Sequence, residues 1–294
     1  MKRKHGSIAL ALALVVAIFA ACGGGGSAGD GGFNTGREIT VVSREDGSGT
    51  RGAFIELMGV QETTADGSTV DRTTVEANIA NGTSIVMGSV AGDNYAIGYI
   101  SLGSLNDTVK ALNLDGAAAT PGNVLSGDYT LARPFIIATS GAQSELAADF
   151  IGFIMSAEGQ AVVGGRGYIP VEASAPAFSG SLPSGTIVIA GSTSVAPVIE
   201  QLSDAYREIN SGASIEIHVQ GTTAGITATI EGISDIAMSS RPLNDNELAA
   251  LDPVTIAVDG LAVIVNNNNP TADITSEQVR DIFIGEITRW NEIG

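Results

Sequence analysis

Hydrophobic residues in this chain of 294 residues fall into short β-like runs that alternate with stretches of helical spacing. In the first half, strands are predicted at 38–42, 96–102 and 135–138, where β-branched or other apolar residues follow one another. Helices are predicted after the loop at 46–50, through Phe54, Ile55 and Leu57, and within 144–163, where apolar positions recur at helical spacing.

The second half repeats this alternation. A strand at 186–190 precedes a helix whose buried stripe is predicted to comprise Val198, Leu202, Tyr206 and Ile209. Apolar and polar residues alternate over 215–220, which predicts a half-exposed strand, whereas 261–265 is apolar throughout, as in strands covered on both faces. Thr275 and Gln278 have the spacing of a capping box before a last helix. This order predicts an α/β fold with mostly parallel sheets, in which ligands bind beyond the carboxyl ends of the strands.

The first thirty residues have the pattern of an export signal. Lys2, Arg3 and Lys4 precede an apolar run at 8–21 that is short for a membrane span. Small residues then lead to Cys22, and this resembles a bacterial lipobox, in which the cysteine is lipidated. Phe19 stands where an aliphatic residue is usual, so cleavage by ordinary signal peptidase is the alternative. The glycine-rich segment that follows has the composition of a flexible tether.

Composition and charge narrow the class of protein. A hydrophobic content of 44% with 38 glycines is typical of a globular chain rich in tight turns. The single cysteine excludes an internal disulfide framework and a multi-cysteine metal site. The formal charge of −18 becomes −21 once the three basic residues of the signal are removed. Such a chain is a poor nucleic-acid binder and repels small anions at long range, so local donors must hold any bound anion.

Four segments consist of a β-like run, a short loop of Gly, Ser and Thr, and then a helix or turn. They lie at 46–51, 190–194, 220–225 and 238–241. A helix N-terminus presents unpaired N–H donors, glycine lets the backbone come close to a ligand, and hydroxyls add donors. Arg44 adds a positive charge with the forked geometry that suits an oxyanion. Each segment alone is typical of an ordinary turn or cap, but the four together predict a site for a small tetrahedral oxyanion.

These segments resemble the phosphate-binding proteins of bacterial phosphate ABC transporters. Residues 187–294 resemble the N-terminal part of that family, with IVIAGSTSVAPVIEQL, VQGTTAGI, DIAMSSRPL and VRDIFIGEITRWNEIG. Residues 37–171 resemble its C-terminal part, with ITVVSREDGSGTRGAF, AIGYISLGSL and GYIPV. The resemblance implies a two-lobed periplasmic-binding-protein-like fold of type II that binds inorganic phosphate between its lobes. It also implies an ABC permease as partner, a monomer without cofactor or metal, and no catalytic residues.

The two parts stand in the reverse of the family's order, so the chain is interpreted as a circular permutant. The alternative is a fragment of a longer protein with another copy of the first part beyond Gly294. The permutant interpretation predicts that Gly294 lies within about 15 Å of Gly36, a distance that four extended residues span. The predicted division is a signal peptide at 1–21, the lipidated Cys22 and tether at 22–35, lobe II at 36–127 and 261–294, lobe I at 128–175 and 186–260, and a linker at 176–185.

The resemblance also implies a role for each site residue. The anion donors it implies are Thr193, Ser194, Thr222 and Ser240 in lobe I and Arg44, Ser48, Gly49 and Thr50 in lobe II. Asp46 is placed to hold Arg44, and Ser239 supports the third loop. Ser194 stands where many members have an aromatic residue, and Ser240 where some have an aspartate that accepts the proton of hydrogen phosphate. Asp259 is the candidate substitute, and sulfate, molybdate and tungstate are kept as alternative ligands.

Two rival functions belong to other classes. A phosphatase or serine hydrolase could use Ser48, but His5 lies in the signal and His218 falls on the polar side of its strand, so no base is evident. A sensor or adhesin could keep the fold without transporting the anion. Intact Arg44 and the Ser/Thr loops favour binding and transport over both.

Overall fold

The computed structural model describes residues 32–64, 68–172 and 174–293, and Phe33–Gly294 form one compact unit. The predicted signal, Cys22 and nearly all of the tether lie outside the described residues.

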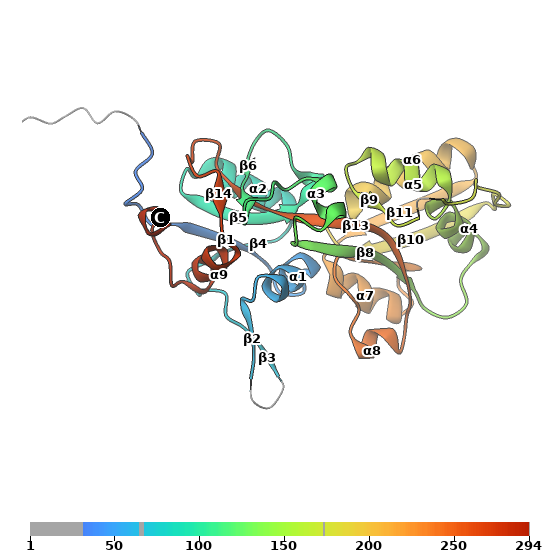
Figure 1. Cartoon of the computed structure of the whole chain (residues 1–294). Helices are drawn as coiled ribbons and strands as arrows, with labels where there is room; N and C mark the ends of the chain where they lie inside the picture. Colours follow the sequence, from blue (N-terminus) through green and yellow to red (C-terminus); the bar gives the residue numbers. More distant parts are fainter. Residues whose placement is uncertain (1–31, 65–67, 173, 294) are drawn as a thin grey trace, which may run out of the picture. The chain divides into compact units, whose positions relative to one another are not determined.

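A single mixed sheet of ten strands is the framework of this unit (Figure 1). Its main path runs β11-β10-β12-β8-β13-β5-β1-β4, with β6 and β9 pairing β13 at the side. The strands are β1 (Thr40–Arg44), β4 (Asn78–Ala80), β5 (Ala96–Ser101), β6 (Lys110–Ala111), β8 (Ala132–Thr139), β9 (Ile169–Pro170), β10 (Gly185–Gly191), β11 (Ala213–Val219), β12 (Ile236–Ser239) and β13 (Asp252–Val265). At one end β10 pairs in parallel with β11 and β12, and at the other β1 pairs in parallel with β4 and β5.

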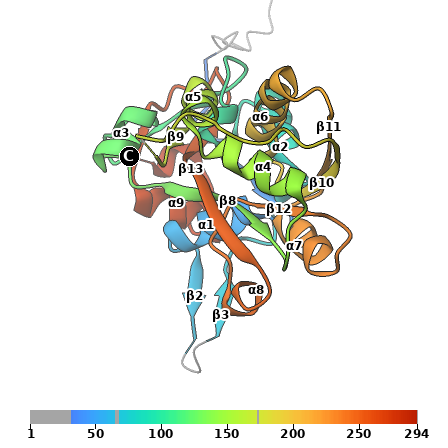
Figure 2. The same cartoon turned by 90° about the vertical axis from the view of Figure 1, so that its right-hand side faces the viewer.

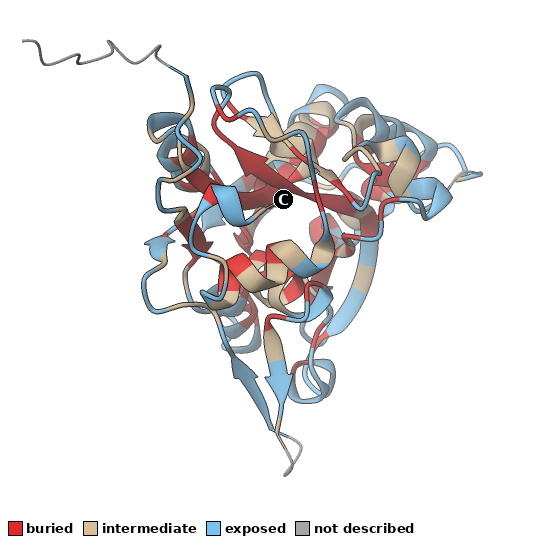
Figure 3. Ribbon diagram, turned by 60° about the vertical axis from the view of Figure 1, so that its left-hand side comes forward, coloured by how far each residue is buried: buried red, intermediate tan, exposed pale blue. Residues whose placement is uncertain are grey.

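The long strand β13 crosses from one lobe to the other. Residues 252–260 of β13 pair with β8, and residues 261–265 pair with β5. Separate hydrophobic cores lie on either side of this crossing, the larger ones around Phe150, Leu202 and Tyr206 and around Phe54, Tyr99 and Phe283. The fold is therefore the two-lobed α/β architecture, and Figure 3 shows how the buried residues concentrate in the sheet. Tyr129 and Leu131 pack in the core of lobe II, so that core extends slightly beyond the predicted limit at residue 127.

Helices cover the sheet in each lobe. They are α1 (Gly49–Leu57), α2 (Thr83–Gly92), α3 (Pro121–Ser126), α4 (Glu145–Ile154), α5 (Ala157–Gly165), α6 (Ala196–Ile209), α7 (Thr222–Ile230), α8 (Asp245–Leu248) and α9 (Ser276–Ile284), with short 3-10 turns at Leu102–Ser104 and Trp290–Glu292. Two small sheets complete the unit: the hairpin β2 (Gln61–Thr63) with β3 (Thr69–Asp71), and β7 (Asn113–Leu114) with β14 (Asp273–Ile274). The hairpin points away from the main sheet on the side where α8 lies (Figure 1 and Figure 2).

Most of the predicted elements are present, with two local corrections. The apolar stretch at 144–163 forms two helices, because Ser156 ends α4 and caps α5 by accepting from the Gly159 amide. Ile209 is half exposed, whereas Val198, Leu202 and Tyr206 are fully buried, because Ile209 ends the helix at the edge of the lobe. The capping box at Thr275 and Gln278 is formed as expected.

The two ends of the described chain lie together, as the permutant interpretation requires. The amide of Asn291 donates to the carbonyl of Thr35 at 2.8 Å, and the Arg289 guanidinium donates to the carbonyl of Gly36 at 3.0 Å. Gly294 itself lies outside the described residues. The linker is fixed to lobe I, where Asp149 accepts from the Ser181 amide and Glu158 accepts from the Phe178 amide, each at 2.8 Å.

Within the described ranges, no single helix is both long and apolar enough to cross a membrane. The bent pair of α4 and α5 passes such a test together, with an angle of 61° between them. Five residues of α4, among them Phe150 and Ile154, are buried within lobe I.

Candidate functional site

Three helices begin where the two lobes meet, and each follows a loop that the sequence analysis singled out. Helix α1 begins at Gly49 in lobe II, and α6 and α7 begin at Ala196 and Thr222 in lobe I. The amide of Thr223 donates to the carbonyl of Gly47 at 3.1 Å, so the starts of α1 and α7 are in direct contact across the lobes. Helix N-termini carry partial positive charge and unpaired N–H donors, so their convergence favours an anion.

Arg44 is the cation of this region and is almost completely buried, with 2% of its side chain exposed. Its Nε and Nη2 donate to the two carboxylate oxygens of Glu45, both at 2.7 Å, and Nη2 also donates to the hydroxyl of Thr193 at 3.0 Å. The third guanidinium nitrogen, Nη1, is buried without a hydrogen-bond partner. A buried charged donor without a partner is costly, so Nη1 is available to an anion in the cleft.

Hydroxyl groups from both lobes surround this arginine. Thr50 Oγ1 lies 2.8 Å from Ser194 Oγ across the lobe boundary, and Ser192 Oγ donates to Ser240 Oγ at 2.9 Å. Thr222 Oγ1 lies 3.4 Å from Ser240 Oγ. Ser48 caps α1 by accepting from the Arg51 amide, so its side chain is already used. The structure thus brings together all eight residues that were named as anion donors.

Gly49 is required by the closeness of the lobes. A Cβ atom at this position would lie 2.4 Å from Thr222 Oγ1 and 2.7 Å from Ser240 Oγ, and both of those residues belong to lobe I. Because its φ lies outside the left-handed region, the constraint comes from space and not from backbone conformation.

Asp46 does not hold Arg44, contrary to the implication of the resemblance. Its side chain is 98% exposed and pairs with Arg51 Nη1 at 3.0 Å, whereas Glu45 forms the bidentate pair with Arg44. The reason is local: β1 ends at Arg44 and turns at once, so that Asp46 faces solvent.

We therefore expect Asp46→Asn to change the affinity for the bound anion less than about twofold, since exposed ion pairs contribute about 0–1 kcal/mol. Isothermal titration of the variant beside the wild-type protein measures this. A tenfold loss would mean that Asp46 does support the arginine in solution.

Asp259 is fully buried but is engaged elsewhere. It accepts from Arg133 Nε and Nη2 at 3.2 and 3.1 Å and from Ser101 Oγ at 2.8 Å. Burial raises the pKa of its carboxyl to about 6, although Arg133 and Ser101 oppose the shift. Arg133 in turn donates to the carbonyl of Ser240 at 3.2 Å. Asp259 therefore ties the crossing strands together behind the third loop and is not free to accept a proton from the anion.

Ser239 also has a local role. Its hydroxyl donates to the carbonyl of Arg241 at 2.7 Å and shapes the turn after β12. It thereby holds the turn that carries Ser240.

Thr83 is a neighbour of the site that the sequence analysis missed. It is the first residue of α2, is 8% exposed, and its hydroxyl lies 3.4 Å from those of both Thr193 and Ser194. The signal was present, because Asn81-Gly82-Thr83-Ser84 again places Gly and hydroxyl residues between a strand and a helix. The short run Asn78–Ala80 has little β character, and so β4 was not predicted.

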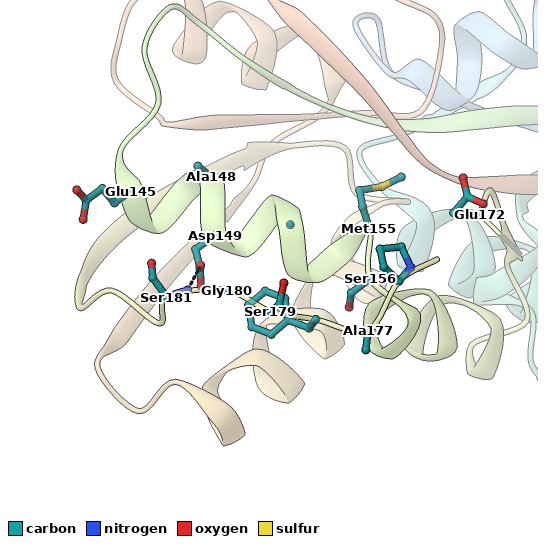
Figure 4. Close-up of a pocket in the computed structure, with 13 residues that line it drawn as sticks. Glu145, Ala148, Asp149, Met155, Ser156, Glu172, Ala177, Ser179, Gly180 and Ser181 are labelled. Atoms are coloured by element: carbon teal, nitrogen blue, oxygen red, sulfur yellow. Dashed lines mark hydrogen bonds between the residues drawn. The ribbon is translucent and has the colours of Figure 1, made fainter. Parts of the chain in front are cut away.

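Another cavity is unsuited to an anion. It has a volume of about 840 Å³ and lies between α4 and the linker (Figure 4). Its lining includes the carboxylates of Glu145, Asp149 and Glu172, and no basic side chain belongs to that lining. In the part of the chain that the structure describes, no group of three or more His, Cys, Asp or Glu side chains is placed to hold a metal ion.

Comparison with known proteins gives a consistent result. A family model described as the PBP superfamily domain matches residues 28–158 and 176–294. The phosphate-binding protein PstS 2 of Streptococcus agalactiae is 46% identical over 257 residues, which cover 87% of each chain. The crystal structure of a phosphate-binding protein of a phosphate ABC transporter from Streptococcus pneumoniae is 43% identical and superposes with a TM-score of 0.70, over 87% of this chain and 100% of that one.

A staphylococcal relative matches over a much shorter stretch. The phosphate-binding protein PstS of Staphylococcus saprophyticus is 32% identical over 111 residues, 35% of each chain. The streptococcal relatives align over most of their length and so share the order of this chain.

Proposed function

This chain belongs to the phosphate-binding proteins of the PBP superfamily, and on that premise we propose that it captures inorganic phosphate between its lobes and delivers it to an ABC importer. The observation that carries the proposal is the buried Arg44, whose Nη1 has no hydrogen-bond partner. It lies in a region where hydroxyl groups and helix N-termini of both lobes meet.

Local donors are sufficient to hold the anion. Hydrogen bonds to charged groups contribute about 1.5–3 kcal/mol each. About six of them, less the costs of desolvation and ordering, leave roughly −8 kcal/mol, which corresponds to an affinity of about 1 μM. The negative charge of the whole chain weakens long-range attraction, so affinity depends on these short contacts.

The protein acts outside the cytoplasm, as expected of phosphate-binding proteins of this type. We further propose that Cys22 carries a lipid anchor, that the folded unit is a monomer, and that its closed form docks on a membrane permease. The lipobox-like sequence before Cys22 and the glycine-rich tether support the anchor.

The enzymatic alternatives have little support. Ser48 is used as the cap of α1, and His218 is exposed on β11 in lobe I. The relatives are named as binding proteins. A role as binding protein without catalysis is accordingly part of the proposal.

Selectivity among tetrahedral oxyanions rests on hydroxyl groups and not on a free carboxylate. Ser240 contacts Ser192 and Thr222, and the carboxylates of Glu45 and Asp259 are each paired with an arginine. Hydroxyls both donate and accept, so they can accept the proton of hydrogen phosphate. A hydroxyl can also donate to an oxygen of sulfate, so the proposed preference for phosphate over sulfate, molybdate and tungstate is supported by the relatives, which are named as phosphate-binding proteins.

Isothermal titration of the protein with phosphate, sulfate and molybdate tests the proposal. We expect phosphate to bind with about micromolar affinity, at least tenfold more tightly than sulfate or molybdate. Tighter binding of another oxyanion would transfer the function to that ligand, and absence of binding to all three would overturn it.

A further inference from the structure

Building on the proposed phosphate site, we infer that Thr83 is a further positioning residue for the anion, and that the first turn of α2 forms an additional wall of the site. Nothing in the sequence motifs that resemble the family assigns a role to this segment.

The placement of α2 follows from the sheet. Strand β4 pairs in parallel with β1, with Ala80 opposite Arg44, so the chain leaves both strands at the same edge. Gly82 then turns with φ of 132°, and α2 begins at Thr83 without a side-chain cap. The first N–H groups of this ten-residue helix therefore lack a capping side chain at the edge where Arg44 lies.

The Thr83 hydroxyl connects two contacts that would otherwise be separate. Arg44 Nη2 donates to Thr193 at 3.0 Å, and Thr50 contacts Ser194 at 2.8 Å. Thr83 Oγ1 lies 3.4 Å from each of the two lobe I hydroxyls. The result is a chain of polar groups that alternates between the lobes, from Arg44 through Thr193, Thr83 and Ser194 to Thr50.

The chain of polar groups from Arg44 to Thr50 restricts how the hydroxyl protons are oriented. Each hydroxyl has one proton to donate and two positions to accept. Thr193 accepts from Arg44, so its own proton is available to Thr83 or to a bound anion. With Thr83 in place, Thr193 and Ser194 are held with the lobes in contact, and we expect the anion to leave more slowly.

A cavity next to this chain of polar groups supports the placement of Thr83 at the site. It has a volume of about 400 Å³ and is lined by the first turns of α2 and α6, including Thr83, and by Thr193 in the loop before α6. Thr83 and Thr193 thus line this space, and Thr193 also contacts the buried Arg44. The buried Arg44 Nη1, which has no hydrogen-bond partner, is the independent observation that points to a ligand near Thr193.

The test compares Thr83→Val with Thr83→Ser. Valine keeps the shape of threonine and removes the hydroxyl, whereas serine keeps the hydroxyl. We expect Thr83→Val to weaken phosphate binding about tenfold, mainly through faster dissociation measured by stopped flow, and Thr83→Ser to stay within about twofold of the wild-type protein. Ser89→Ala, at an exposed position beyond the first turn of α2, is the control and should bind normally.

The thermal unfolding midpoint without phosphate separates positioning from folding. We expect it to be similar in all four proteins, so that a loss of affinity cannot be assigned to unfolding. Wild-type affinity in Thr83→Val, or an equal loss in Thr83→Ser, would overturn the inference while leaving the phosphate function intact. Failure of the wild-type protein itself to bind phosphate would instead overturn the proposed function.

Discussion

Arg44→Ala is expected to reduce the affinity for phosphate by at least about a thousandfold, which corresponds to about 4 kcal/mol. The variant loses Nη1, a buried guanidinium donor without a hydrogen-bond partner, and leaves the carboxylate of Glu45 without its cation in the cleft. The local charge thereby changes from balanced to negative, which disfavours an anion further. Isothermal titration or equilibrium dialysis with radiolabelled phosphate measures the effect.

Arg72→Ala is the matched control, because Arg72 belongs to the same lobe and pairs with Glu62 while 59% of its side chain is exposed. The affinity of the Arg72→Ala variant for phosphate should equal that of the wild-type protein. Near-normal binding by Arg44→Ala would contradict the proposed site, provided that the variant unfolds at a temperature close to that of the wild-type protein.

Gly49→Ala is expected to weaken phosphate binding about a hundredfold or more while leaving the fold intact. The added methyl group would meet Thr222 and Ser240 at distances that real side chains do not tolerate, and both of those residues lie on the other lobe. The clash is therefore relieved by opening the cleft, at the cost of the contacts that hold the anion. Alanine is favoured over glycine in a helix, so the unfolding temperature without phosphate should stay the same or rise slightly.

Gly88→Ala in α2 provides the comparison, because a Cβ there meets nothing within 4 Å. It should bind phosphate normally. If Gly49→Ala also binds phosphate normally, the two lobes approach each other less closely around the anion than they do in the structure.

The sequence predicted the elements with strong patterns and missed those that depend on tertiary contacts. Strand β10 and helix α6 follow directly from their apolar spacing, and the Ser/Thr loops at 46–51, 190–194, 220–225 and 238–241 were found from their residue types, whereas the loop before Thr83 was not. The hairpin of β2 and β3 was missed because its strands are short and polar, with Gln61, Glu62 and Asp71 among their residues. Its pairing is visible only in three dimensions.

Prediction of the site from the sequence was limited in the same way, by contacts that form only in the folded chain. The residue pattern and the resemblance together supplied Arg44 and its neighbours. Which carboxylate pairs with the arginine depends on the direction of the chain after β1, and there Glu45 takes the place expected of Asp46. Thr83 lies 110 positions from Thr193 in the sequence, so only the parallel pairing of β4 with β1 brings them together. The full burial of Asp259 beside Arg133 likewise comes from the crossing of β8 and β13.

A crystal structure of the protein with phosphate would show directly which residues bind the anion. We expect the phosphate to accept from Arg44 Nη1 and to lie within hydrogen-bond distance of Thr50, Ser194 and Thr222, with both lobes contributing donors. Phosphate found on one lobe alone, or away from Arg44, would contradict the proposal that the two lobes enclose it.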